Sequence, residues 1–223
     1  MNYVAWDIET CPLPSEALPD AQQERLRSEV ERLRERSPEK SEEALHRQAG
    51  SFHPHLGWIC CISAVRGSSS GGVEEPKSWT AASPEEEEAL LDQFWADVHA
   101  IGRHHDRSRE DLRWVTFNGK GFDVPFLTAR TIANGLAPTR KDITHTYPYD
   151  HDPHADLMGI WQSSNYSLEG LCSFLGVDAP KDEVDGSMVA ELTRDGRIGE
   201  VADYCEGDAV ATLLCAQETS VLL

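Results

Sequence analysis

The sequence has 223 residues, of which 39% are hydrophobic and 26% are charged. A chain of this length can bury the core of one domain of moderate size. Its formal net charge of -19 at pH 7 argues against loose, charge-driven binding to nucleic acid, because such binding depends on Lys and Arg that neutralise phosphates. The charge does not exclude an enzyme that meets nucleic acid through bound cations.

Membrane and secreted proteins are disfavoured. The apolar runs are far shorter than the roughly 20 residues that span a bilayer, and the N-terminal stretch MNYVAWDIET lacks the basic and apolar regions of a signal peptide. Six cysteines occur without CxxC pairs or a Cys/His spacing that suits zinc. We therefore expect reduced thiols and a cytoplasmic protein that does not enter a membrane.

Residues 2–8 are the first predicted strand, and a highly charged segment, residues 15–50, follows it. Three apolar side chains of this segment fall on one helical stripe, namely Leu26, Val30 and Leu33. Ser37-Pro38-Glu39 has the cap and first-turn residues that start a second helix. We expect an inserted helical hairpin whose outer face is solvated and rich in i, i+3 ion pairs. The alternative, that this charged insertion binds a protein partner, stays open.

The other elements follow from hydrophobic period and turn residues. They comprise a strand at 56–65, a hairpin partner at 74–79, a helix from the capping box Ser83-Pro84-Glu85-Glu86 to Ile101, a strand at 113–118, and helices at 122–136, 167–175 and 187–223, the last broken near Asp195-Gly196. The basic segment 103–109 is predicted to be a solvated loop. Strands early in the chain and helices late in it indicate an α/β domain with a mixed sheet.

Four carboxylates lie in three short segments of the sequence, here called stations, which folding can bring together. Asp7 and Glu9 lie in a strand that is otherwise buried, and residues i and i+2 of a strand point to the same face. Asp123 begins a helix after a strand, and Asp208 lies four residues after Tyr204 on a late helix. Clustered carboxylates without a cation raise one another's pKa, and hard oxygen ligands of this kind suit Mg²⁺ or Mn²⁺. A pair of such ions activates water at a phosphodiester and stabilises the leaving oxygen.

Each later station has an ordinary structural alternative when it is taken alone. Asp123 is more typical of a helix N-cap than of a metal ligand. Tyr204 and Asp208 are more typical of a surface contact between neighbouring turns.

The three stations, DIET, NGKGFDVPFL and YCEGDAVAT, resemble the exonuclease motifs of the DEDD superfamily of 3′-to-5′ exonucleases, which have a ribonuclease H-like fold. Within it the chain resembles the predicted exonucleases related to the proofreading domain of family B DNA polymerases, which also have stretches similar to HADLM, SLEGLCSFLG and DGSMVAEL. With Tyr204 four residues before Asp208, the third motif is similar to that of the tyrosine subclass. The resemblance implies that residues 1–223 form a single exonuclease domain, a mixed β-sheet flanked by helices and interrupted by the charged insertion.

The resemblance also implies roles for particular residues. Asp7, Glu9 and Asp208 would hold one of two Mg²⁺ or Mn²⁺ ions, Asp7 would bridge to the second, and Asp123 would complete the second site. Tyr204 would orient the attacking water. The 3′-terminal nucleotide would be held by residues near the motifs, namely Ile8, Thr10, Asn118 and Phe122, although Phe122 is as typical of the core as of base stacking.

The leading hypothesis is therefore a metal-dependent 3′-to-5′ exonuclease that acts on single-stranded DNA with a free 3′ end. An exoribonuclease or an oligonucleotide-degrading enzyme of the same fold is the first alternative, and a catalytically inactive binding module is the second. Asp156 suits either the site or a helix cap. A phosphate contact by Lys181, near the end of the loop at 176–186, is disfavoured. A metal site made of His145, His151 and His154 is disfavoured, because these residues lie in a Pro- and Asp-rich segment.

Overall fold

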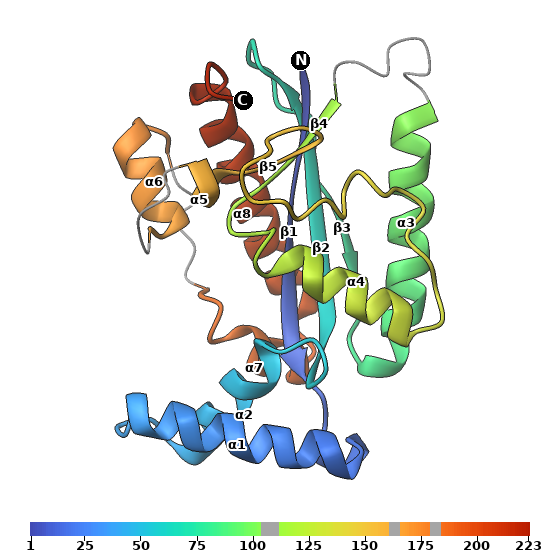
Figure 1. Ribbon diagram of the computed structural model, residues 1–223, viewed down its shortest axis with the longest axis vertical. Helices are drawn as coiled ribbons and strands as arrows, with labels where there is room; N and C mark the ends of the chain where they lie inside the picture. Colours follow the sequence, from blue (N-terminus) through green and yellow to red (C-terminus); the bar gives the residue numbers. More distant parts are fainter. Residues whose placement is uncertain (104–111, 161–165, 179–183) are drawn as a thin grey trace.

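A five-stranded mixed sheet forms the centre of the computed structural model, which describes residues 1–103, 112–160, 166–178 and 184–223. The strand order is β3-β2-β1-β4-β5 (Figure 1). The strands are β1 (Asn2–Pro12), β2 (Gly57–Ser68), β3 (Lys77–Thr80), β4 (Leu112–Thr116) and β5 (His154–Asp156). Because β1 pairs antiparallel with β2 and parallel with β4, the predicted mixed sheet is confirmed.

Helices cover both faces of this sheet. Figure 1 shows α3 and α4 on one side, and α8 with α5 and α6 on the other. The helices are α1 (Asp20–Arg36), α2 (Glu42–Ser51), α3 (Glu87–Arg103), α4 (Asp123–Ala133), α5 (Leu157–Ile160), α6 (Leu168–Leu175), α7 (Val189–Arg194) and α8 (Ile198–Glu218), with 3₁₀ turns at Ser15–Ala17 and Pro84–Glu86. None of the helices in the described part of the chain has the length and apolar character needed to cross a membrane.

The central strand β1 is buried on both faces, and its C-terminal half carries the acidic residues Asp7 and Glu9. Val4 and Trp6 belong to the core under α3 and α4, whereas Tyr3 and Ala5 belong to the core under α6 and α8. The pairing of β1 with β4 ends at Ala5, so the later residues of β1 have a free edge on that side. Such an edge offers backbone groups that need other partners.

A buried ion pair ties α3, α4 and β2 together. The Glu87 carboxylate is fully buried, and it accepts a hydrogen bond from the Ile59 N–H at 2.7 Å. It also accepts hydrogen bonds from Arg130 Nε at 3.0 Å and from Asn134 Nδ2 at 3.0 Å. The charge of Glu87 is therefore compensated within the core, as a buried carboxylate requires.

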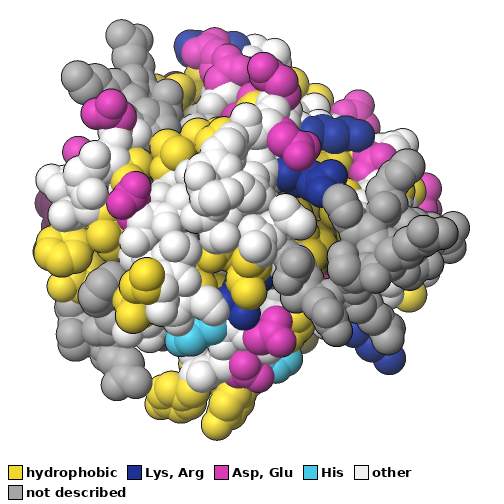
Figure 2. Space-filling model, turned by 90° about the horizontal axis from the view of Figure 1, so that it is seen from above, with side chains coloured by type: hydrophobic (Ala, Val, Ile, Leu, Met, Phe, Trp, Pro, Cys, Tyr) yellow, Lys and Arg dark blue, Asp and Glu magenta, His cyan; other side chains and the backbone are white. Residues whose placement is uncertain are grey.

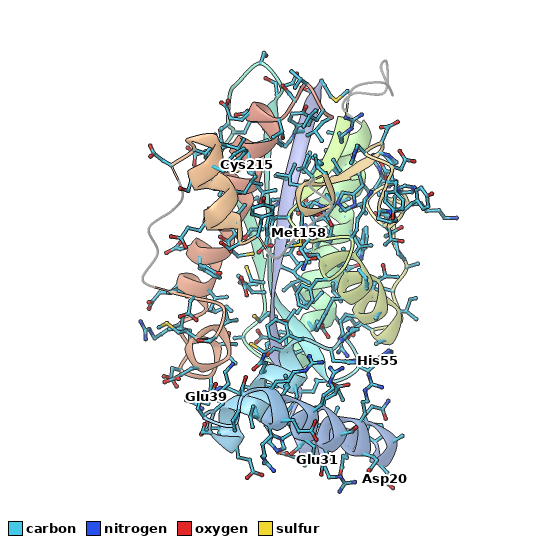
Figure 3. All side chains as sticks on the ribbon, turned by 60° about the vertical axis from the view of Figure 1, so that its left-hand side comes forward. Asp20, Glu31, Glu39, His55, Met158 and Cys215 are labelled. Atoms are coloured by element: carbon cyan, nitrogen blue, oxygen red, sulfur yellow. The ribbon has the colours of Figure 1, made fainter. Side chains whose placement is uncertain are left out.

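The charged insertion forms two packed helices at one end of the sheet (Figures 1 and 3), with Asp20 and Glu31 on α1 at its outer side. Leu26 and Val30 of the predicted stripe are buried against Leu45 of α2, which confirms the hairpin. The second helix starts later than predicted: its N-cap is Ser41, whose Oγ accepts the Ala44 N–H at 3.2 Å, and not Ser37. Of the expected i, i+3 ion pairs on α1, the one between Glu29 and Arg32 is present, whereas Arg34 pairs with Glu42 of α2 instead of Glu31.

Several boundaries differ from the predictions for local reasons. The hydroxyl of Ser83 makes no capping hydrogen bond, and the Ala82 N–H donates instead to Glu86. The strand β5 was not predicted, because three residues between loop residues give no periodic signal. The break between α7 and α8 agrees with the prediction. The basic segment 103–109 lies almost entirely outside the described residues.

Candidate active site

The acidic residues of β1 face the long C-terminal helix. Asp7 and Glu9 continue the face of the strand that carries Tyr3 and Ala5, and that face packs on α8. One carboxylate oxygen of Asp7, one of Glu9 and the Sγ atom of Cys205 all lie within 4.8 Å of one another. The thiol of Cys205 donates to Asp7 Oδ2 at 3.7 Å. Asp7 and Glu9, the two acids that the sequence indicated, therefore belong to one polar cluster.

Asp123 reaches this cluster from the other face of the sheet. Its Oδ1 atom accepts the N–H of Ile8 at 3.2 Å, at the part of β1 that lies beyond the last pair with β4. The N-cap of α4 is Phe122, and Asp123 is the first residue of the helix. The alternative that Asp123 is a helix N-cap is therefore wrong, since its buried carboxylate serves the neighbouring strand.

The third station lies on the buried side of α8. The hydroxyl of Tyr204 is hydrogen bonded to Asp208, and both side chains are partly buried. The carboxylates of Asp208 and Glu9 repel each other, which shows that α8 places Asp208 next to β1. The alternative of an ordinary surface contact is therefore also wrong.

The electrostatics of the cluster are those of acids without a counter-charge. Burial raises the pKa of Asp7 well above its usual range, and Asp123, Glu9 and Asp208 raise it further. Burial and then Asp208 raise the pKa of Glu9 in the same way. Burial is also the largest cause that raises the pKa of Asp123 to about 7. The bare cluster therefore holds protons near neutral pH or attracts cations.

The loop before Asp123 is held by Asp156. Asp156 Oδ1 accepts the Asn118 N–H at 2.8 Å, and its Oδ2 accepts the Lys120 N–H at 3.0 Å. Asn118 has a φ of 64°, a conformation that Asn tolerates, and a side chain at Gly119 would collide with Thr116. Asp156 also accepts the Met158 N–H at 3.0 Å. Its carboxylate thus caps a helix and fixes the backbone of the second motif at once.

Three of the four predicted nucleotide contacts line a cleft beside Glu9. This cleft has a volume of about 450 Å³, and Ile8, Thr10 and Phe122 contribute to its walls. The Thr10 hydroxyl donates to the Ser51 carbonyl at 2.7 Å, which gives Thr10 a structural role as well. Asn118 is exposed, but it is not among the residues that line the cleft.

The remaining candidates have ordinary surroundings or lie outside the described residues. His154 is buried, with its Nε2 atom 2.9 Å from the Thr116 hydroxyl. Within the described residues, the group of metal-ligating side chains that lie within 4.8 Å of one another contains no histidine. Lys181 lies outside the described residues. Sequence reasoning missed Cys205, whose position beside Tyr204 in the third motif was the available signal.

Known structures share this fold. A family B DNA polymerase from the hyperthermophilic archaeon Pyrobaculum calidifontis is similar with a TM-score of 0.63 and 16% identity, over 99% of this chain and 24% of the polymerase. A structure of exonuclease I is similar with a TM-score of 0.50 and 14% identity, over 99% of this chain and 41% of that enzyme. The chain thus spans less than half the length of either protein. No curated protein matches it.

The family is shown by the sequence. Residues 51–219 match the family described as predicted 3′-5′ exonuclease related to the exonuclease domain of PolB. The match confirms the resemblance and the enzyme class that the motifs indicated, and it begins after the charged insertion. The chain belongs to this family of predicted 3′-5′ exonucleases related to the exonuclease domain of PolB.

Proposed function

We propose that the protein is a metal-dependent exonuclease that removes nucleotides from the 3′ end of single-stranded DNA. The observation that carries the proposal is the convergence of Asp7, Glu9, Asp123 and Asp208 from three distant parts of the chain. Crowding of this kind lowers stability unless a ligand compensates for it. Carboxylates that are kept together although their repulsion lowers the stability of the folded protein indicate a function for the site.

The donor set fits two Mg²⁺ or Mn²⁺ ions. It consists of carboxylate oxygens, which hard divalent cations prefer. Burial raises the pKa of the neighbouring Cys205 thiol well above its usual range, so this soft donor stays protonated and the oxygens define the site. Asp7, Glu9 and Asp208 would hold one ion, and Asp7 and Asp123 the other. When bound, the ions would supply an activated water and stabilise the leaving oxygen of the phosphodiester.

The protein's own residues orient the reactants. Burial raises the pKa of Tyr204 far above its usual range, and Asp208 adds to this effect, so the phenol does not act as a base at neutral pH. Its O–H bonds to Asp208, which leaves the lone pairs of the oxygen to accept a hydrogen bond from the attacking water. Ile8, Thr10 and Phe122 form the adjoining walls, where the 3′-terminal nucleotide would lie.

DNA is the proposed polymer because the family is related to the exonuclease domain of a DNA polymerase. Acidic and basic side chains are interspersed on the face shown in Figure 2, which is the end of the molecule opposite the charged insertion. The net charge of -19 agrees with a substrate that meets the site through cations rather than through a broad basic surface. All six cysteines are free thiols, which supports action in the cytoplasm. A protein partner on the outer face of α1 stays a prediction.

The test is a time course with 5′-labelled single-stranded DNA and RNA of one sequence, in Mg²⁺, in Mn²⁺ and in chelator. We expect a metal-dependent ladder that shortens from the 3′ end, with DNA preferred. Asp7→Ala and Asp208→Ala should abolish it. The matched control is Asp203→Ala, since Asp203 is an exposed residue of the same helix and should be dispensable. An Asp7→Ala protein that keeps most of the activity would refute the site.

A further inference from the structure

The charged insertion forms one wall of the cleft that begins at the carboxylate cluster. On one side the cleft is lined by Ile8, Glu9, Thr10 and Phe122, and on the other by residues that follow α1 or belong to α2 and its end, namely Lys40, Ala44, Arg47, Gln48, Ser51 and Phe52. The third side of the cleft is formed by Gly186 and Ser187, just before α7, and by Ala190 in its first turn. The volume of about 450 Å³ is within the range of roughly 300–1,000 Å³ that is typical of ligand sites.

This wall is fixed to the catalytic strand. The Thr10 hydroxyl donates to the carbonyl of Ser51 at the end of α2, at 2.7 Å. A side chain at Gly50 would collide with Pro12, so α2 and the end of β1 are in direct backbone contact. Leu45 and Ala49 of α2 are buried in the insertion's own core. The inner side of α2 is therefore held in place beside Glu9, whereas the outer side of α1 faces away from the site (Figure 1).

The side chains on this wall suit a nucleotide. Phe52 has an exposed fraction of 64%, and its ring lies edge-on to Phe122 with centroids 5.9 Å apart. Exposed aromatic rings are the surfaces on which proteins stack single-stranded bases. Phe122 is partly buried against the core, so the exposed ring of Phe52 extends the apolar surface beside Phe122 into the cleft.

Positive charge accompanies the aromatic pair. Lys40 is exposed, and its Nζ donates to the neutral amide of Gln48 at 2.9 Å, with no carboxylate partner among the described residues. Arg47 is ion-paired with Glu43 at 2.9 Å on the surface, an interaction that a phosphate can replace at little cost. In a chain with a net charge of -19, two cations beside an acidic cluster are complementary to a phosphodiester.

We propose that the insertion is a substrate subsite, which binds the nucleotide that precedes the 3′-terminal one. This proposal rests on the proposed function and extends it. The base of that nucleotide packs on Phe52 beside Phe122, and its phosphates contact Lys40 and Arg47. The occupant is a single strand, because a base paired in a duplex cannot present its face to a protein ring. The inner side of α2 is thus a binding surface, although the charged outer side of α1 is a solvated one.

Two substrates test this inference. One is a fluorescein-labelled single-stranded DNA of ten nucleotides, and the other is the p-nitrophenyl ester of thymidine 5′-monophosphate, which carries no second nucleotide. Phe52→Ala should lower kcat/KM for the oligonucleotide about 5- to 150-fold, the range for loss of one base stack, and should leave the ester unchanged. Lys40→Gln combined with Arg47→Gln should reduce the slope of log kcat/KM against log salt by about 1.4, the value for two phosphate contacts on single strands.

The controls match each change in chemistry and exposure. Arg27→Gln combined with Arg34→Gln removes two exposed, ion-paired cations of α1 that do not line the cleft, and it should leave both parameters unaltered. Phe174→Ala removes another exposed aromatic side chain, on α6, which does not line the cleft. Since Phe52 is exposed, its replacement should leave the melting temperature nearly unchanged, and this is checked for every variant.

The outcomes separate this inference from the proposed function. Normal oligonucleotide turnover and an unchanged salt slope in the Phe52 and Lys40/Arg47 variants overturn the subsite, and they make the insertion a site for a protein partner or a purely structural element. If the unaltered protein hydrolyses neither substrate, the proposed function fails, but fluorescence anisotropy of the labelled DNA still tests the subsite. In that assay the same variants must bind more weakly than their controls, or the subsite is wrong.

Discussion

Replacement of Asp123 by Asn should stabilise the metal-free protein, and the gain should grow with pH. The folded-state pKa of about 7 compares with a usual value of 3.8, a rise of about 3 units. A group whose pKa is raised by folding binds more protons in the folded state between these two values. Stability is therefore lost as pH rises through that window, by about 1.4 kcal/mol per unit, or about 4 kcal/mol in total above pH 7.

The amide of Asn escapes this cost because it does not ionise. Its oxygen can still accept the Ile8 N–H that Asp123 now accepts at 3.2 Å, so the contact with β1 is kept. Between pH 5 and pH 8 the wild-type protein crosses about 2 units of the window. The free energy of unfolding of Asp123→Asn relative to the wild type should therefore increase by about 3 kcal/mol over this range.

Urea unfolding of the metal-stripped protein, followed by tryptophan fluorescence at pH 5 and pH 8, measures this difference. A gain in stability that is absent at pH 8, or that is the same at both pH values, would contradict the electrostatic account of the cluster. Asp203→Asn, at an exposed position, should show no such trend. Addition of Mg²⁺ should stabilise the wild type more than the Asp123→Asn variant, because the ion compensates a charge that the variant lacks.

Three further outcomes follow from the structure. Tyr204→Phe should lower kcat about 10- to 100-fold through loss of water orientation while the Mg²⁺ concentration for half-maximal activity stays the same, and an unaltered kcat would remove Tyr204 from the mechanism. Arg130→Met should cost about 3–5 kcal/mol in urea unfolding, because it leaves the buried Glu87 carboxylate without its cation. Burial lowers the pKa of His154 to about 3, so the unfolded chain binds the extra proton and stability falls as pH drops below 6.5. The advantage of the wild type over His154→Asn in urea unfolding should therefore shrink by about 2 kcal/mol between pH 7 and pH 5, and a constant difference would refute the buried neutral ring.

Local patterns in the sequence were sufficient to select the candidate residues of the three stations. The spacing of Asp7 and Glu9 in a strand puts both on one face whatever the rest of the fold does. The spacing of Tyr204 and Asp208 does the same on a helix. Longer amphipathic segments, such as α1 and α3, also carry enough periods to be recognised, and the family resemblance joined the stations into one hypothesis.

Short elements and dual roles depend on contacts that no local pattern encodes. The strand β5 has three residues, and only its pairing with β4 makes it a strand. Asp156 looked like a helix cap or a site residue, but its carboxylate fixes the backbone of the second motif because β5 ends beside that loop. The sequence around Asp123 is typical of an N-cap, but in the structure its carboxylate accepts the N–H of Ile8 at the free edge of β1.

The sequence by itself therefore determined which residues are candidates for the chemistry, since residue type and local period are properties of short segments. The tertiary structure alone decided that four acids from positions 7 to 208 lie in one cluster, because only the packing of α4 and α8 on β1 creates their mutual repulsion. It also decided that α2 stands beside Glu9. The charge pattern of the insertion predicted a solvated surface, and only the contacts of Thr10 with Ser51 and of Pro12 with Gly50 turn its inner side toward the cleft.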